Sequence, residues 1–329
     1  MGKGLDVGTN MLVCGFTGED GIPKFKMERD AFYRIVPKSD VNKNAISNSL
    51  QKRGSNFIVD GDDFIVVGED ALQIAIERND VASRPMRRGV ISPREKSNLP
   101  MLKLLISNLI GKGEGDESLI YSVPAKPIDG MFDIVYHTEI LNMFFREQGY
   151  SSHPINEAFA IALSELLDDA LTGIAISFGA GMCNIAVIHQ GDPLIEFSIT
   201  RSGDFIDQSV ANALDLSPSL VQLEKEAGVS LYSPSNKIME AVSVYYASVI
   251  SYVLSNIAYE LKKREKSLPL FREPVPIVVS GGLALADGFV RMLNERINNV
   301  DLPMEIKEIR KASSPMTCVA NGCYLASQL

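Results

Sequence analysis

One glycine-rich turn in the middle of the chain, Gly179-Ala180-Gly181, offers backbone groups that could bind an anion. Two apolar runs, residues 174–178 and 185–188, flank the turn and predict a β-hairpin. Glycine accepts a positive φ, and a turn without bulky side chains lets backbone N–H groups approach a phosphate closely. An ordinary tight hairpin has the same pattern, so this turn alone is a weak signal.

A similar hairpin at the start of the chain adds a carboxylate. Predicted strands at residues 4–7 and 11–16 flank the turn Gly8-Thr9-Asn10, and Asp6 lies on the first of them. An acid beside a glycine turn suits a Mg²⁺ ion, usually held through water, while the turn amides bind phosphate oxygens. The alternative is an aspartate that only caps the turn.

A third glycine-containing turn follows a late apolar strand. Residues 276–280 predict a buried strand, which leads into Gly281 and Gly282 and then into a helix from about Ala286. A strand, a glycine pair and a helix in succession let a nucleotide lie against the backbone.

These three turns, in this order, resemble the ATPase superfamily of actin, heat-shock chaperones and sugar kinases, and more closely the prokaryotic actins of the MreB type. Four further segments are similar to MreB motifs and extend the resemblance over almost the whole chain. They are Arg84–Ile91, Pro154–Ala160 (first connecting motif), Arg201–Asp207 (a Gly-Asp-x-x-Asp pattern) and Cys318–Ala326 (second connecting motif).

The resemblance implies an α/β actin-like ATPase fold, with two similar ribonuclease H-like domains flanking a nucleotide cleft. Domain I would comprise residues 1–170, with residues 32–84 inserted as a small lobe. Domain II would comprise residues 171–312, and the C-terminal helix, residues 313–329, would return to domain I. Because a single short segment separates two predicted helices near residue 230, we expect the upper lobe of domain II (about 208–270) to be reduced to helices.

The resemblance also assigns roles to individual residues. Asp6 would organise Mg²⁺ through water, and Glu157 would position or polarise the attacking water. The two hairpin turns would hold the β- and γ-phosphates of ATP or ADP, and Gly281 and Gly282 would lie along adenosine. Gly203 belongs to the nucleotide-binding set through the Gly-Asp-x-x-Asp pattern.

Ribose or base contact is expected from the helix that ends at Gly228. Ser217 and Pro218 predict its start, as N-cap and first helical residue. Aligning this helix on its closing glycine puts Glu226 at the family's acidic position. The basic position then holds Glu224, with Lys225 beside it, which puts the usual lysine contact in doubt.

The second hairpin departs from the family pattern. Ser177 stands where an aspartate is usual, and Met182 and Cys183 stand where threonines are usual. A serine supplies no negative charge to a metal–water shell, whereas the backbone amides of the turn are unchanged. We therefore expect nucleotide binding with slow ATP hydrolysis at most. The alternative is a degenerate site that binds nothing.

Composition narrows the classes of partner. The chain has 329 residues, 46% of them hydrophobic, which suffices for two cores. A net charge of −9 disfavours direct nucleic-acid binding. Four cysteines inside apolar segments, and an N-terminus that enters a strand directly, indicate a cytoplasmic protein without a signal peptide. No apolar run approaches membrane-spanning length, so any membrane attachment is expected through an adaptor partner.

Three functions remain open. The first is an MreB-like cytoskeletal protein that binds ATP and polymerises with itself into filaments. The second is a non-polymerising adaptor of the same fold, like those of division and pilus machinery, which binds nucleotide structurally and recruits a partner. The third is a chaperone or sugar kinase, for which we find neither a substrate domain nor a sugar-proton acceptor.

Overall fold

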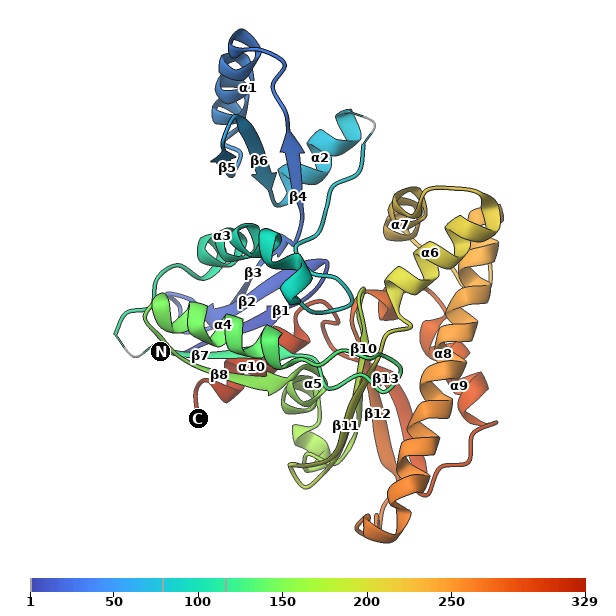
Figure 1. Cartoon of the computed structure of the whole chain (residues 1–329). Helices are drawn as coiled ribbons and strands as arrows, with labels where there is room; N and C mark the ends of the chain where they lie inside the picture. The colour runs from blue at the N-terminus through green and yellow to red at the C-terminus, as the bar shows by residue number, and fades with distance from the viewer. Residues whose placement is uncertain (1, 79, 116) are drawn as a thin grey trace.

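A five-stranded sheet carries the first glycine-rich turn in the computed structural model, which describes residues 2–78, 80–115 and 117–329. Its strands stand in the order β3-β2-β1-β7-β8. Their bounds are β1 Lys3–Val7, β2 Met11–Thr17, β3 Pro23–Arg29, β7 Glu117–Val123 and β8 Tyr150–Asn156. The first three form an antiparallel meander, and β7 and β8 add to it in parallel. Helices α3 (Leu99–Ile110) and α4 (Val135–Glu147) pack over one face (Figure 1).

A second five-stranded sheet repeats this arrangement in the other half of the molecule. Its order is β11-β10-β9-β12-β13, again with three antiparallel strands followed by two parallel additions. The strands are β9 Gly173–Phe178, β10 Cys183–His189, β11 Asp192–Ile199, β12 Val275–Ser280 and β13 Ile306–Lys311. The equivalent strand orders confirm the expected α/β fold built from two similar halves.

Two helices, α5 (Glu157–Glu165) and α10 (Cys318–Ala326), join the halves. Their apolar residues share one core with residues of both sheets. The contact is close because a Cβ at Gly322 would lie only 1.8 Å from the carbonyl oxygen of Ala160. The hairpin turns of the two sheets are thereby held face to face across a cleft.

The expected small lobe has its own sheet and its own core. The sheet order is β4-β6-β5, and the lobe comprises β4 Phe32–Ile35, α1 Asp40–Arg53, β5 Phe57–Asp60, β6 Asp63–Val67 and α2 Glu69–Glu77. It projects away from the first sheet at the top of Figure 1. The assignment of residues 32–84 as an insertion, like the domain boundaries at 170 and 312, stays a prediction.

Four helices cover the outer face of the second sheet. They are α6 Gly203–Leu214, α7 Pro218–Ala227, α8 Lys237–Arg264 and α9 Phe289–Ile297. In the part of the chain that the structure describes, no strand lies between α7 and α8. The Ser217 hydroxyl accepts the Leu220 N–H and so caps α7, as its position before Pro218 indicates.

One predicted helix start is wrong. The helix expected from about Ala286 begins at Phe289, because a 3-10 turn (Gly282–Leu285) and Gly288 at φ 80° intervene. Helix α5 begins at Glu157, since β8 runs to Asn156, whose side chain caps the helix. Further 3-10 turns span Pro93–Asn98, Leu167–Asp169 and Glu265–Ser267.

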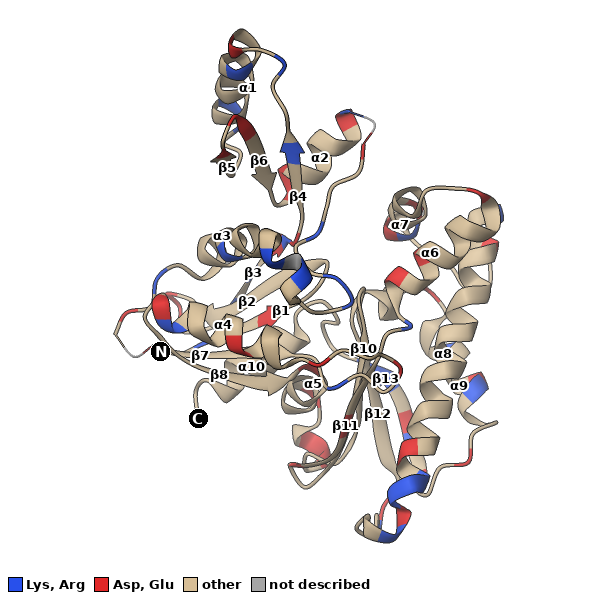
Figure 2. Ribbon diagram, viewed as in Figure 1, with Lys and Arg blue, Asp and Glu red and all other residues tan. Residues whose placement is uncertain are grey.

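The long helix α8 contradicts the expectation that no apolar run approaches membrane-spanning length. Together with its 3-10 extension to Ser267, it is long and apolar enough to span a membrane by length and composition alone. The apolar residues on one face, including Val242, Val249 and Leu254, are buried in the core against the second sheet, whereas Val244 and Tyr259 are exposed. Figure 2 shows that the charged residues of α8 lie near its two ends, with more of them at the C-terminal end. This burial is the pattern of a core helix.

Candidate functional site

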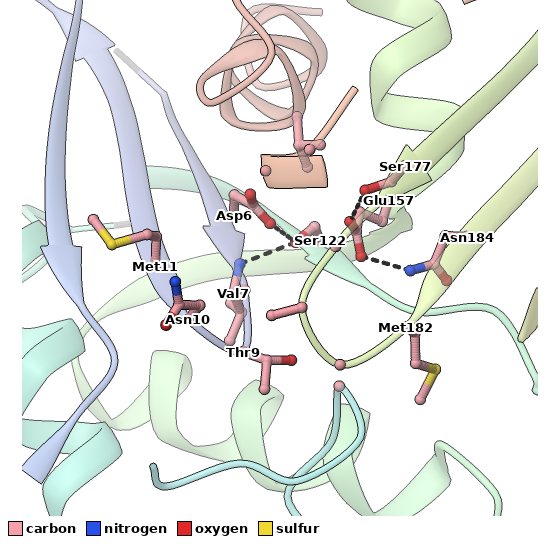
Figure 3. A pocket seen from close by; sticks show the side chains of 18 of the residues that line it. Asp6, Val7, Thr9, Asn10, Met11, Ser122, Glu157, Ser177, Met182 and Asn184 are labelled. Carbon is pink, nitrogen blue, oxygen red and sulfur yellow. Dashed lines mark hydrogen bonds between the residues drawn. The ribbon is translucent and has the colours of Figure 1, made fainter. Parts of the chain in front are cut away.

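The two glycine-rich turns face each other across the cleft and line one cavity of about 110 Å³ (Figure 3). The turn between β1 and β2 carries Gly8, Thr9 and Asn10, and the turn between β9 and β10 carries Gly179, Ala180 and Gly181. Asp6, Glu157, Gly281 and Gly282 also line this cavity. The structure therefore brings together residues from near the start, the middle and near the end of the chain.

Glycine is required where the turns meet. A Cβ at Gly181 would lie 2.6 Å from the Thr9 hydroxyl oxygen and 2.3 Å from the backbone nitrogen of Gly89. Gly89 itself has φ 73°, and the Met182 side chain packs over it. Gly89 thus completes the wall of the cavity, a role that the motif Arg84–Ile91 did not reveal.

Asp6 is held by a residue from the neighbouring strand. The Ser122 hydroxyl, on β7, donates a 2.8 Å hydrogen bond to Asp6 Oδ1 and accepts the backbone N–H of Val7 at 3.0 Å. Burial raises the pKa of Asp6 to about 6, although the bond from Ser122 opposes the shift. Sequence reasoning missed Ser122 because its partner lies on a strand far away along the chain.

Glu157 is clamped at both carboxylate oxygens. It begins α5, directly after Asn156, whose side-chain oxygen accepts the backbone N–H groups of Ala158 and Phe159. The Ser177 hydroxyl donates to Glu157 Oε1, and the Asn184 amide donates to Oε2 at 2.7 Å. The two clamping residues come from opposite strands of the second hairpin.

The orientation of the Asn184 amide is determined by a second hydrogen bond. Its oxygen accepts the backbone N–H of Ala125 at 3.0 Å, which leaves the nitrogen facing Glu157. Burial, and then the charge of Asp6, raise the pKa of Glu157 to about 8, against the opposing effect of the bond from Ser177. Glu157 is therefore largely protonated at neutral pH before any cation arrives.

This donor set fits Mg²⁺ bound together with phosphates. Two carboxyl groups in one buried cavity, with pKa values raised to about 6 and about 8, repel one another when ionised, and a divalent cation relieves that repulsion. Among the described residues, no group of three His, Cys, Asp or Glu forms a complete metal cage. Mg²⁺ suits such a site because it commonly keeps waters and takes oxygens from substrate phosphates.

A larger cavity of about 370 Å³ adjoins the first. Both cavities are lined by Asn10, Gly179, Ala180 and Gly282, so they form a continuous cleft. The larger one is also lined by Gly203 and Glu226, the two remaining residues of the predicted nucleotide set. Its apolar walls come from Val229, Tyr246, Leu283, Leu285, Ala286 and Met316.

Two glycines shape the larger cavity in different ways. Gly203 packs against the second turn, since its N–H donates to the Gly179 carbonyl and a Cβ there would lie 3.1 Å from Ala180 Cα. A Cβ at Gly282, in contrast, would meet no atom within 4 Å. Gly282 therefore leaves open a space that any larger residue would fill.

The basic residue that α7 contributes to the larger cavity is Lys225. Aligning the helix on Gly228 placed Glu224 at that position, but the structure brings Lys225 into the cavity wall instead. Lys225 Nζ pairs with Asp207 Oδ1 at 2.6 Å and donates to the Gly203 carbonyl at 3.1 Å. Burial raises the pKa of Asp207 to about 6 despite this ion pair. A lysine therefore does line this cavity, one position after the one that the alignment indicated.

The raised pKa of Glu157 predicts how stability depends on pH. Its folded-state value of about 8 exceeds the ordinary 4.5, so Glu157 contributes stability that is present below about pH 4.5 and is lost as the pH rises to 8. Glu157→Gln cannot ionise. Between about pH 6 and pH 9, at about 1.4 kcal/mol per pKa unit, we expect the wild type to lose about 2 kcal/mol of unfolding free energy relative to this variant.

Urea unfolding of both proteins across this pH range, without nucleotide, measures the difference. The ionisations of Glu157 and Asp6 are linked, so the measured difference includes the change that Glu157→Gln causes in the titration of Asp6. Parallel stability curves for the two proteins would show that Glu157 is already ionised at pH 6.

Comparison with known proteins places the chain in a family. A family model described as Volactin matches residues 1–327. The cell shape-determining protein Mbl of Bacillus subtilis (strain 168) is 25% identical over 294 residues, covering 78% of this chain and 83% of Mbl.

Two solved structures share the whole fold. The MamK double helical filament matches with a TM-score of 0.73 and 16% identity, covering 99% of this chain and 98% of MamK. MreB 5 of Spiroplasma citri, bound to AMPPNP, matches with a TM-score of 0.69 and 16% identity, covering 99% of this chain and 95% of that protein. The expected resemblance to MreB-type actins is confirmed: the chain belongs to the Volactin family, and its fold is that of the actin-like ATPase superfamily.

Proposed function

We propose that this protein is a cytoskeletal actin-like protein that binds ATP with Mg²⁺ in the cleft, polymerises with itself and hydrolyses ATP slowly. One observation carries the proposal. Every residue of the predicted nucleotide set lines the two adjoining cavities between the halves of the molecule. The smaller cavity, lined by the two glycine-rich turns, Asp6 and Glu157, suits phosphates with their cation, and the larger cavity with apolar walls suits a nucleoside.

Nucleotide binding is supported by the neighbours of the same fold. MreB 5 of Spiroplasma citri has been solved with AMPPNP and with ADP, and a MamK mutant with AMPPNP. In this chain, backbone at the two turns would hold the β- and γ-phosphates. Asp6 would hold a hydrated Mg²⁺, which supplies electrostatic stabilisation to the phosphate oxygens, and Glu157 would position the attacking water.

Slow hydrolysis is expected from the hydrogen bonds that Glu157 accepts. The residue that must orient a water has one carboxylate oxygen engaged by Ser177 and the other by Asn184. Both acceptor oxygens are thus occupied by protein donors, and an attacking water must displace one of them. The site therefore supports nucleotide binding better than turnover.

Polymerisation is supported by MamK, which forms a double helical filament, and by the cell shape-determining protein Mbl. Repeating one head-to-tail contact between identical chains builds an open filament. We place this assembly in the cytoplasm, with any membrane contact made through an adaptor.

High-speed pelleting of the purified protein tests the proposal. It is run with Mg-ATP, with the non-hydrolysable analogue AMPPNP and without nucleotide, and the pellets are viewed by negative-stain electron microscopy. We expect filaments with either nucleotide and few without. A protein that binds nucleotide but stays monomeric at every concentration and salt would overturn the filament and favour the structural adaptor.

A further inference from the structure

The small lobe, residues 32–84, joins the rest of the chain at two crossings that lie side by side. The chain enters after β3 and leaves at Ser83, and the backbones of Phe32 and Ser83 exchange hydrogen bonds there. An arginine stands at each crossing: Arg29 ends β3, and Arg84 directly follows Ser83. Both arginines reach across the cleft to the second half of the molecule.

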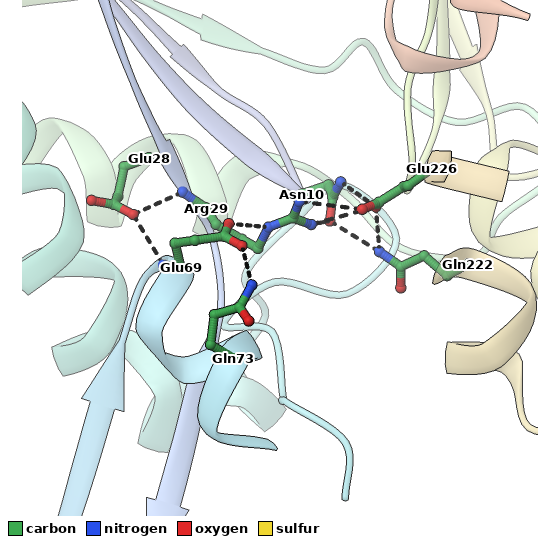
Figure 4. A network of polar contacts seen from close by, with 7 residues as sticks. All are labelled: Asn10, Glu28, Arg29, Glu69, Gln73, Gln222 and Glu226. Atoms are coloured by element: carbon green, nitrogen blue, oxygen red, sulfur yellow. Dashed lines mark hydrogen bonds and ion pairs between the residues drawn. The ribbon is translucent and has the colours of Figure 1, made fainter. Parts of the chain in front are cut away.

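The Arg29 guanidinium contacts the small lobe, α7 and, through a 3.4 Å hydrogen bond from Nη1 to Asn10 Oδ1, the first glycine-rich turn (Figure 4). Its Nε donates to Glu69 Oε2, at the start of α2 in the small lobe, at 2.9 Å. Its Nη2 donates to Glu226 Oε2, on α7 across the cleft, at 3.2 Å. The Arg29 side chain is only 16% exposed, so these ion pairs are partly shielded from water.

Glu226 is the centre of the cross-cleft contacts. Besides Arg29, it accepts hydrogen bonds from Gln222 at 2.8 Å and from Asn10, in the first phosphate turn, at 3.1 Å. Burial would raise the pKa of Glu226, but the bonds from Gln222 and Arg29 outweigh it and lower the pKa. Glu226 is therefore an ionised partner for Arg29 at neutral pH.

Arg84 makes the second cross-cleft pair and has another acid beside it. Its Nη1 lies 2.9 Å from Asp204 Oδ1 in the first turn of α6, and its Nη2 donates to Gln222. Asp30, between the two crossings, is fully buried, and neither carboxylate oxygen has a hydrogen-bond partner among the described residues. Arg84 acts electrostatically on Asp30 as well. A fully buried carboxyl without a partner is costly, so a rearrangement that gives it one is favourable.

From these contacts we propose that Arg29 and Arg84 form a latch that couples the small lobe to the closure of the cleft. With the pairs Arg29–Glu226 and Arg84–Asp204 formed, the small lobe is held against α6 and α7. When the cleft opens, both pairs break together, and Arg84 turns to Asp30 within its own half.

The latch also shares residues with the cleft. Asn10 lines both cavities, and Arg29 and Glu226 line the larger one. A nucleoside that contacts Glu226 must compete with Arg29 for the carboxylate, and phosphates at the first turn compete for Asn10. Nucleotide occupancy therefore loosens the hold on the small lobe, a consequence that rests on the proposed nucleotide site.

Distance measurement between spin labels tests the latch without nucleotide. Ser49→Cys on α1 and Ala213→Cys on α6 place the labels at exposed positions, whereas all four native cysteines are buried. We expect Arg29→Gln and Glu226→Gln each to give longer and broader distances than the wild type. Arg34→Gln is the matched control, because Arg34 pairs with Asp60 and Asp63 inside the small lobe and not across the cleft.

Distances in Arg29→Gln and Glu226→Gln equal to those of the wild type would overturn the latch. A shift of the same size in Arg34→Gln would overturn it too, since it would show that any lost ion pair loosens the lobe. Circular dichroism of each labelled variant checks that the fold is retained.

Release of a fluorescent ATP analogue tests the link to nucleotide. Because Glu226 is then free for the nucleoside, we expect Arg29→Gln to release it about tenfold more slowly than the wild type, a change that corresponds to about 1.4 kcal/mol, and Arg34→Gln to match the wild type. Equal release from Arg29→Gln and the wild type would overturn the link. Failure of every variant, wild type included, to bind the analogue would refute the nucleotide site, while the distances would still decide the latch.

Discussion

Gly282→Leu is expected to weaken ATP binding at least about a hundredfold, or about 2.7 kcal/mol, while the protein stays folded. A Cβ at Gly282 would meet no atom within 4 Å, and the residue lines both cavities. A leucine there would therefore project into the space proposed for the nucleoside without displacing any protein atom. Titration with a fluorescent ATP analogue measures the loss.

Gly282→Ala is the matched control for this variant. A single methyl group fills far less of the cavity, so we expect a loss of affinity well below that of the leucine variant. Thermal unfolding without nucleotide should be close to that of the wild type for both. Full ATP affinity in Gly282→Leu would show that the nucleoside does not lie against Gly282.

Ser177→Asp is expected to speed ATP hydrolysis by about a hundredfold, in the range typical of a restored electrostatic group at an active site. The aspartate would replace the neutral hydroxyl that now donates to Glu157 and would add a negative charge to the metal–water shell. Glu157 Oε1 would lose its donor and become free to accept a hydrogen bond from water. Single-turnover phosphate release with Mg-ATP measures the rate.

Ser177→Asn separates charge from shape. Asparagine has the size of aspartate but no charge, so it should leave the rate near that of the wild type. Equal rates for the two variants would refute the role of the missing carboxylate. The aspartate variant should also be less stable than the asparagine variant without Mg²⁺, because it places a third carboxyl beside Asp6 and Glu157.

The sequence by itself determined the fold and the turns at its centre. Gly181 and Gly282 can be recognised in the sequence because each lies in a glycine-containing turn that follows an apolar strand. The order of the turns and connecting motifs sufficed to predict two similar α/β halves around a cleft. Ser217 and Pro218 predicted the start of α7 for an equally local reason.

Helix starts were predicted less well where neighbouring structure competes with propensity. Within the motif Pro154–Ala160, residues 155–156 belong to β8 because they pair with β7, and the helix begins only at Glu157. Gly288, in the left-handed region, delays α9 to Phe289. The identity of the basic residue that α7 contributes to the larger cavity was also missed, because a shift of one position on α7 exchanges Glu224 for Lys225.

Only the tertiary structure decided which side chains hold the acids of the site. Ser122 reaches Asp6 from β7, Asn184 reaches Glu157 from β10, and Arg29 reaches Glu226 across the cleft. Each pair lies between 27 and 197 positions apart in the sequence, and no local pattern specifies it. The contacts of Asn184 and Arg29 depend on the packing of α5 and α10 between the sheets, which brings the halves together, whereas Ser122 meets Asp6 through the pairing of β1 with β7. Burial in that arrangement, rather than residue type, raises the pKa of Glu157 and limits the chemistry of the cleft.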